Sequence, residues 1–570
     1  MKSFKVRHWF VRAFLCGSWG VFFWVCSSAA QDPNYLNAQM PWHDVVLDSH
    51  DKLLAWYHPE RNLGYDQVLR LTWDFLEHKV PLDTAKGTNL KIYLTFPIFQ
   101  EENLQGVVYQ HNPASLYAHL VDELVNWYPY SGDEEAIPVI REMLDYQMAH
   151  GTTPNDWNWA GVPFATSCPG DKEYGRCISD MPTQFYGGIE TDKIAELGLG
   201  YVYFYEITGE RKYLDAGLRC ADALVKHVRP GDADHTPWPF RVDAHSGEVI
   251  DREEFGGMIV ASVRLFDELI RIGAGDIAGF RKTRDLAWNW ILTIQLTENP
   301  SSDLWTGYYE DVPKDTLNVN DQSSMMTAYY ILTHNDPASL DPNPTALRSW
   351  QTHVGYLLDR SRGMLGRGPF FGAWAIDEQQ HAIVPIPGLS GLSCCSRAGL
   401  SCRTAAWGAI NALYYEKTGD ANARENAFRS LNYATYFMSS DGKFACCGLS
   451  HGSTYWFEDG YADAGRNLMW AMGAIPDLAP IGQNHLLRSS SVVQNVKYED
   501  RKVAYQTFDD RGVAVLRLSF KPFRVMAGDK MLNERSDLQQ AGYTLRALSG
   551  GDYIVRVRHA ESKQVALIGR

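Results

Sequence analysis

The sequence predicts a mainly α-helical protein, an (α/α)6 toroid of helical hairpins that is followed by a small C-terminal antiparallel β domain. One observation is a segment that recurs as WYPYSGD, FYEITGE and YYEKTGD, starting at Trp127, Phe204 and Tyr414. Another is a change of pattern after Ser489, where apolar and polar residues begin to alternate as they do in strands. A repeated unit that cannot bury its apolar face alone indicates an array whose members cover one another.

Each recurring segment is interpreted as the turn of a helical hairpin, because helical spacing continues after it. Leu214, Leu218 and Ala221, for example, follow one another in steps of four and three. Hairpins are expected at 44–80, 116–150, 191–229, 258–295, 322–360 and 404–438, and the apolar stretch RNLMWAMGAI could close the array. An open solenoid is the alternative, because the sequence does not show closure.

Three regions are expected: a signal peptide at 1–30, the toroid as the catalytic domain at 31–480, and the β domain at 489–570. The first carries Lys2 and Arg7 before an apolar run that ends in Ser28-Ala29-Ala30, the small residues that a signal peptidase needs. That run is shorter than the roughly 20 residues of a membrane span. We therefore expect a periplasmic or extracellular protein.

Composition restricts the partners. A net charge of −15 disfavours nucleic acid and anionic membranes, so neither is expected as a partner. Aromatic residues make up 13% of the chain, and many stand in expected loops such as NDWNWAG and HGSTYWFEDGY. Aromatic rings in wet loops favour a carbohydrate substrate, since sugars also have flat apolar faces. The alternative is that these rings pack the loops together. The composition does not indicate an oligomeric state.

Carboxylates stand in the loops that lead into the first helix of each hairpin, where helix N-termini favour oxygen-rich ligands. Cleavage of a glycosidic bond needs one carboxylic acid and one carboxylate. We expect Asp192 to be the general acid and Glu254 or Asp321 to act on water, and Glu190 is a further expected catalytic residue. The alternative for each is a helix N-cap. The expected substrate-binding residues are Trp157, Trp159, Tyr186, Arg403, His451 and Trp456.

With these hairpin turns and aromatic loops, the chain resembles the secreted (α/α)6-toroid carbohydrate-active enzymes. These include unsaturated uronyl hydrolases and the β-L-arabinofuranosidase type. Cys394-Cys395 and Cys446-Cys447 are similar to the Cys-Cys element of the latter's zinc site, but no Glu-x-Cys pair occurs. No metal ligand and no cofactor are therefore predicted.

The resemblance implies a glycoside hydrolase. A lyase that acts on a uronate-containing polysaccharide is an open alternative, since Arg403, Arg466, His451 and Tyr455 could serve it. A non-catalytic glycan-binding protein is the other.

The cysteines of an exported protein are expected to form disulfides. Cys168 would pair with Cys177, and the group at 394–402 would pair with 446–447. A thiolate metal site made from the latter five cysteines is the alternative. Cys220 lies among apolar residues of an expected helix, so we expect it to be a buried free thiol.

Overall fold

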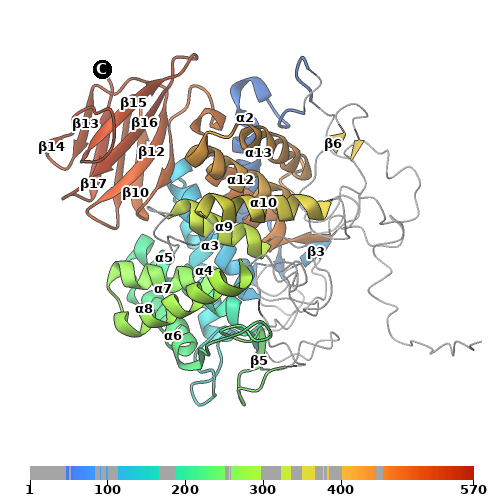
Figure 1. Ribbon diagram of the computed structural model, residues 1–570. Helices are drawn as coiled ribbons and strands as arrows, with labels where there is room; N and C mark the ends of the chain where they lie inside the picture. Colours follow the sequence, from blue (N-terminus) through green and yellow to red (C-terminus); the bar gives the residue numbers. More distant parts are fainter. Residues whose placement is uncertain are drawn as a thin grey trace, which may run out of the picture.

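The structure is a computed structural model, mainly helical, with a region of antiparallel sheet at the C-terminal end (Figure 1). It describes residues 46–50, 53–83, 90–91, 98–100, 113–165, 187–250, 256, 258–296, 322–334, 349–365, 376–377, 382–383, 401–444 and 454–570. The expected signal peptide lies outside these residues.

Hairpins of two consecutive helices make up most of the described helical region. They are α3 (Pro113–Ser131) with α4 (Ala136–His150), α5 (Thr191–Thr208) with α6 (Arg211–His227), α7 (Ile259–Ile272) with α8 (Ile277–Trp290), α9 (Gln322–Thr333) with α10 (Trp350–Leu365), and α12 (Ser401–Thr418) with α13 (Ala421–Ala434). Short 3₁₀ and π segments are η3 (Pro59–Arg61), η4 (Phe75–Lys79), η6 (Ile291–Gln295), η8 (Thr435–Phe437), η9 (Phe457–Ala464) and η10 (Pro476–Leu478).

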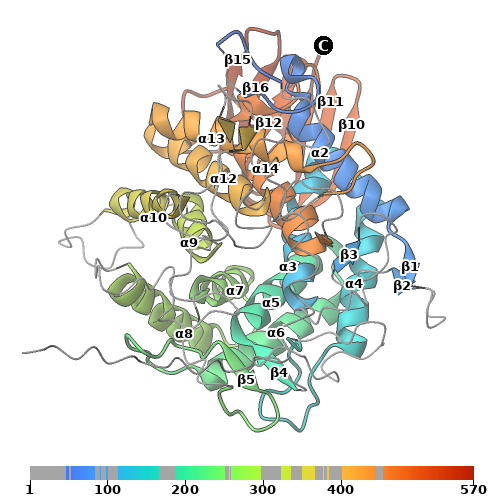
Figure 2. The ribbon, with the colours of Figure 1, turned by 90° about the vertical axis from the view of Figure 1, so that its right-hand side faces the viewer.

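The first helices of these hairpins contact one another in a cycle. Helix α3 packs on α5, α5 on α7, α7 on α9, α9 on α12, α12 on α14 (Gly465–Ala474), and α14 on α3 again. Figure 2 shows this arrangement, with the second helices placed outside it. We call α3, α5, α7, α9, α12 and α14 the ring helices.

The expected first hairpin at 44–80 is wrong. Only its second half forms an α-helix, α2 (Leu63–Asp74), and α2 packs on α14 at the other end of the helical region. The described residues of the preceding segment are not helical: Leu47 and Leu53 form an antiparallel bridge, and Tyr57, His58 and Asn62, with φ of 67°, 39° and 55°, separate this segment from α2. The helix RNLMWAMGAI therefore takes the place of the missing first helix.

The recurring turn has the same geometry in all three copies. Its glycine has a φ of 75° each time, and the glycine N–H donates to the carbonyl four residues earlier at 2.7 or 2.8 Å. The preceding Ser or Thr hydroxyl donates to another carbonyl four residues earlier and accepts from the N–H of the acidic residue after the glycine. These residues are Ser131-Gly132-Asp133, Thr208-Gly209-Glu210 and Thr418-Gly419-Asp420. The prediction of helical-hairpin turns is confirmed.

The C-terminal region forms two antiparallel sheets, as predicted. One has the order β10 (Val493–Glu499), β11 (Lys502–Thr507), β17 (Gln564–Ile568), β13 (Arg524–Ala527) and β14 (Lys530–Met531). The other has the order β15 (Gly542–Ala547), β16 (Tyr553–His559), β12 (Gly512–Leu518) and β9 (His485–Ser489). Strand β9 begins at His485, before the start at 489 that the sequence predicts. The alternation does not reveal it, because its first three residues are all buried.

Short strand pairs connect loops of the helical region. They are β1 (Leu82–Asp83) with β2 (Leu90–Lys91), β3 (Ile98–Gln100) with β8 (Thr454–Trp456), β4 (Gly188–Glu190) with β5 (Arg241–Asp243), and β6 (Ile376–Asp377) with β7 (Ala382–Ile383). Pair β4–β5 lies directly before α5 and fixes the backbone at the start of that ring helix.

The sheets dock on the ring helices through buried polar contacts. The ring of His485 stacks on Tyr130 of α3 at 4.1 Å, and its Nδ1 lies 2.8 Å from the Tyr130 carbonyl. Burial lowers the pKa of His485 to about 4, so the imidazole is neutral. Arg488 binds both carboxylate oxygens of Glu416 of α12 at 2.7 Å.

Cys220 is a buried free thiol, as predicted, and burial raises its pKa to about 12. Cys402 is buried in the first turn of α12. The other cysteines outside the expected signal peptide lie outside the described residues. Within the described part of the chain there is no disulfide. None of the helices in the described ranges is both long and apolar enough for a membrane span.

Candidate active site

Polar side chains gather where the ring helices begin. On α3, Ser115, His119 and Asp122 follow one another in steps of four and three, which puts them on one face of the helix. All three are buried. Since a buried polar group needs partners, this face must meet complementary groups on other helices.

His119 lies between two carboxylates from different parts of the chain. Its Nδ1 is 3.1 Å from Oδ1 of Asp463 in η9, and its Nε2 is 3.4 Å from Oε1 of Glu196 in α5. Burial lowers the pKa of His119, but Asp463 and Glu196 outweigh burial, and the pKa is raised overall. The structure therefore favours a protonated imidazole at this position.

Asp122 lies between two guanidinium groups. Its Oδ2 is 3.3 Å from Nη2 of Arg264 in α7 and 3.2 Å from Nη1 of Arg466 in α14. Each guanidinium also lies over an aromatic ring, Arg264 over Tyr329 at 5.4 Å and Arg466 over Trp470 at 5.3 Å. These two rings stack on each other at 3.8 Å. The stacked rings hold both arginines toward Asp122.

Further charges extend the network across the ring. Lys193 Nζ lies 3.6 Å from both Asp192 Oδ2 and Glu196 Oε2, all on the first turns of α5. Arg403 of α12 places Nη1 3.2 Å from Asp463 Oδ2. Four basic side chains (Lys193, Arg264, Arg403, Arg466) thus pair with four carboxylates (Asp122, Asp192, Glu196, Asp463), and a protonated His119 adds one positive charge.

Glu123, the residue after Asp122, is completely buried behind this network. Burial raises the pKa of its carboxyl well above the usual range. The carboxyl lies against Gly465, where an added Cβ would be only 2.4 Å from Oε2 of Glu123. The structure therefore favours the neutral form of Glu123, which adds no negative charge next to the network.

A small pocket opens onto these side chains. It is lined by Ala118, His119, Asp122, Glu196, Leu199, Gly200, Ala261, Arg264 and Arg466. The lining comes from four ring helices, α3, α5, α7 and α14. Charged groups that belong to separate helices therefore converge on one small volume, which suits acid–base chemistry on a polar ligand.

Two of the residues expected from the sequence belong to this network. Asp192 is buried in the first turn of α5 beside Lys193, and Arg403 is buried in the first turn of α12 beside Asp463. Both lie where a ring helix begins, as expected.

Glu190 and the two tryptophans of the NDWNWAG loop have protein partners. Glu190 forms an ion pair with Arg241 at 2.7 Å between β4 and β5, and both side chains are 2% exposed. Trp159 is buried and stacks on His227 at 4.0 Å. Trp157 is half-buried and meets Phe164 edge to face at 5.9 Å. For these residues the contacts are those of packed loops.

The remaining expected residues have no described side chain. Glu254, Asp321, Tyr186 and His451 lie outside the described residues, and Trp456 is described only as part of β8, where it pairs with Ile98.

The sequence analysis does not predict four residues of this site, because they lie within helices and the predicted site residues come mainly from loops. These residues are His119, Asp122, Glu196 and Arg264. The available signal was the helical spacing of Ser115, His119 and Asp122.

No family model and no curated protein matches this chain. Among solved structures, it is similar to a sugar epimerase from a ruminal bacterium, with 11% identity, a TM-score of 0.47 and coverage of 74% of this chain and 100% of the epimerase. It is also similar to an α-1,2-mannosidase from Trichoderma reesei, with 14% identity, a TM-score of 0.41 and coverage of 73% and 86%. An unsaturated glucuronyl hydrolase specific for heparin has 10% identity, a TM-score of 0.42 and coverage of 72% and 98%. These similarities are too distant to define a family or an activity for this chain.

Proposed function

We propose that the chain is a glycoside hydrolase built on an (α/α)6 toroid, and that the pocket above is its active site. The observation that supports this most is that two carboxylates, Asp122 of α3 and Glu196 of α5, line the same pocket. Glycosidic bond cleavage by acid–base catalysis needs two such groups on either side of the bond.

The two carboxylates have different surroundings, which suits different roles. Asp122 lies between Arg264 and Arg466. It is therefore placed to act either as the base that activates water or as the nucleophile that attacks the sugar. Glu196 lies within 3.4 Å of His119 Nε2 and Ser115 Oγ, so it is placed to exchange a proton with the imidazole. In this scheme the proton that His119 holds passes to Glu196, and Glu196 donates it to the leaving oxygen.

The carboxylates expected from the loops remain part of the proposal. Asp192 lies one turn before Glu196 on the same helix, and Lys193 links the two, so Asp192 is a second candidate for the acid. Glu254 and Asp321 precede α7 and α9, and each is a candidate for the partner carboxylate.

The organisation and location that we infer from the sequence also remain proposals. They are a signal peptide at 1–30, a catalytic region at 31–480, a β domain at 489–570, and a periplasmic or extracellular protein.

A second candidate function is proton abstraction next to a carboxylate or carbonyl, which a uronate lyase or an epimerase needs. The observation that favours it is His119, an imidazole that lines the pocket together with two arginines, Arg264 and Arg466. The imidazole could exchange the proton, and the guanidinium groups could neutralise the charge that develops on the substrate.

The test is a product assay on the protein purified without residues 1–30, with a panel of neutral and uronate-containing oligosaccharides. New reducing ends without ultraviolet absorbance support the hydrolase. Ultraviolet-absorbing unsaturated products support the lyase, and an inverted or isomerised sugar at constant chain length supports the epimerase. Binding of a glycan with no product of any kind would contradict an enzyme and support a glycan-binding protein.

A further inference from the structure

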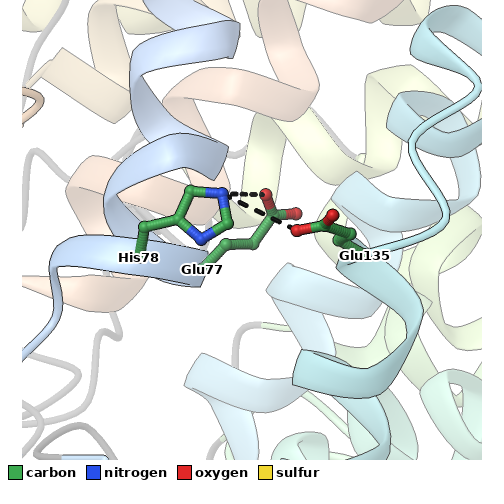
Figure 3. A group of neighbouring side chains, drawn as sticks. All are labelled: Glu77, His78 and Glu135. Carbon is green, nitrogen blue, oxygen red and sulfur yellow. Dashed lines mark ion pairs between the residues drawn. The ribbon is translucent and has the colours of Figure 1, made fainter.

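Glu77, His78 and Glu135 come together in a cluster apart from the pocket (Figure 3). Glu77 and His78 belong to η4, which continues α2, and Glu135 is the residue directly before α4. His78 Nε2 lies 3.8 Å from Glu77 Oε2 and 3.7 Å from Glu135 Oε2, and the three potential ligand atoms all lie within 4.8 Å of one another. We call these residues the Glu77 cluster.

Glu77 is buried although it carries a carboxylate. Its side chain is 7% exposed, and its Oε1 is buried without a hydrogen-bond partner. The carboxylates of Asp133, Glu135 and Asp74 lie close enough to act on it electrostatically. A buried carboxylate that faces other carboxylates is unfavourable unless a proton or a cation neutralises it.

The neighbouring lysines direct their charges to other groups. Lys79 Nζ lies 2.5 Å from Asp74 Oδ2 and 3.2 Å from the Asp441 carbonyl oxygen. Lys91 Nζ donates to the backbone carbonyl of Glu77 at 3.0 Å, not to its carboxylate. In these contacts Lys79 neutralises Asp74, and neither lysine pairs with the Glu77 carboxylate.

We propose that Glu77, His78 and Glu135 bind a divalent transition-metal ion. An imidazole nitrogen with two carboxylate oxygens is a donor set that Zn²⁺ accepts, with bonds of about 2.0–2.2 Å. A tetrahedral ion with such bonds holds its ligand atoms about 3.4 Å apart. The spacings of 3.7 and 3.8 Å from His78 need to shorten by a few tenths of an ångström, and the two carboxylate oxygens, which lie within 4.8 Å of each other, must also come to that distance. His78 and Glu135 are 54% and 74% exposed, so they are free to make this adjustment, and water can take the fourth position.

The ion would have a structural role. Helix α2, which η4 continues, packs on α14, the last ring helix, whereas α4 packs on α3, the first. An ion held by η4 and the start of α4 therefore joins the outer helices at the two ends of the helical region. None of the three ligands lines the pocket, so we expect the ion to change stability and not the chemistry.

The test is calorimetric titration of untagged, chelator-treated protein with Zn²⁺, together with thermal unfolding with and without the ion. We expect binding of one Zn²⁺ and a higher unfolding temperature. Glu77→Gln and His78→Ala should each weaken binding at least tenfold, and Glu135→Gln, at an exposed position, is a third variant in case the Glu77 variant fails to fold.

His235→Ala is the matched control, because His235 is an exposed histidine that contacts one carboxylate, Asp232, at 2.9 Å. It should bind Zn²⁺ as the wild type does. Absence of Zn²⁺ binding by the wild type, equal affinity of the wild type and His78→Ala, or preference for Ca²⁺ over Zn²⁺ would overturn the proposal.

Discussion

His119 Nδ1 lies 3.1 Å from Oδ1 of Asp463, and this contact joins α3, the first ring helix, to η9, which leads into the last one. The Asp122–Arg466 contact at 3.2 Å joins the same two regions. The polar network therefore depends on the return of the helical region to its starting point. An open solenoid would separate these residues.

We predict that His119→Gln lowers turnover at least about a hundredfold, because the variant loses the imidazole that exchanges protons with Glu196. The measurement is kcat on the best glycan of the panel. His150→Gln, at the end of α4, is the control and should keep wild-type turnover. Near-normal turnover of His119→Gln would remove His119 from the mechanism.

Asp122→Asn should lower the free energy of unfolding by about 3–5 kcal/mol, the usual cost when one member of a buried charge pair is removed. The Asp122 side chain is 12% exposed, and its loss removes the carboxylate that Arg264 and Arg466 share, while Arg466 keeps its ion pair with Asp463. Urea denaturation measures the change. Glu561→Gln, whose partner Lys530 is equally exposed, should show no measurable change. Equal stability of both variants and the wild type would show that the Asp122 contacts contribute little.

His485 predicts a pH dependence of stability. Its pKa of about 4 in the folded protein lies below the unfolded value of about 6.5. Between these values the unfolded chain binds more protons, so the free energy of unfolding should rise with pH across this window. The whole difference corresponds to about 3 kcal/mol.

His485→Gln should remove this contribution, and urea denaturation at several pH values between about 4 and 7 measures it. His150→Gln is again the control and should keep the wild-type slope. An unchanged slope in His485→Gln would mean that this imidazole is accessible to protons in the folded protein.

The recurring turn predicts opposite effects of the same substitution at two glycines. Gly209→Ala should lower the free energy of unfolding by about 1–2 kcal/mol, because Gly209 has a φ of 75°. No atom lies within 4 Å of the added Cβ, so only the backbone is strained. Gly355→Ala, at an equally open position within α10, should raise the free energy by about 0.5–1 kcal/mol. Urea denaturation distinguishes the two, and an equal effect would contradict the role of the turn.

The sequence predicts the elements of this fold well, because they depend on local patterns. The hairpin turns follow from the Gly209 motif and its copies, the C-terminal strands from alternation, and the buried Cys220 from its apolar neighbours. The error at 44–80 is also local: its apolar residues have helical spacing, but Tyr57, His58 and Asn62 adopt left-handed backbone angles that spacing alone does not reveal.

The site is harder to predict, because its partners come from separate helices. The spacing of His119 and Asp122 on α3 shows that a polar face exists, but only the fold shows that Asp463, Glu196 and Arg466 meet it. The sequence predicts a site in the loops, because carboxylates and aromatic residues are frequent there. Trp159 shows the limit of that signal, since a tryptophan in a loop can equally stack on a neighbouring histidine.

The most direct test of the proposed active site is the initial rate of Glu196→Gln on the glycan that the wild type cleaves best. We predict a rate at least about a hundredfold below wild type with an unchanged circular dichroism spectrum, because the amide keeps the shape of Glu196 but cannot take up and donate a proton. Glu142→Gln, at an exposed position of α4, should keep the wild-type rate. A Glu196→Gln variant that is as active as Glu142→Gln would show that bond cleavage does not take place in this pocket.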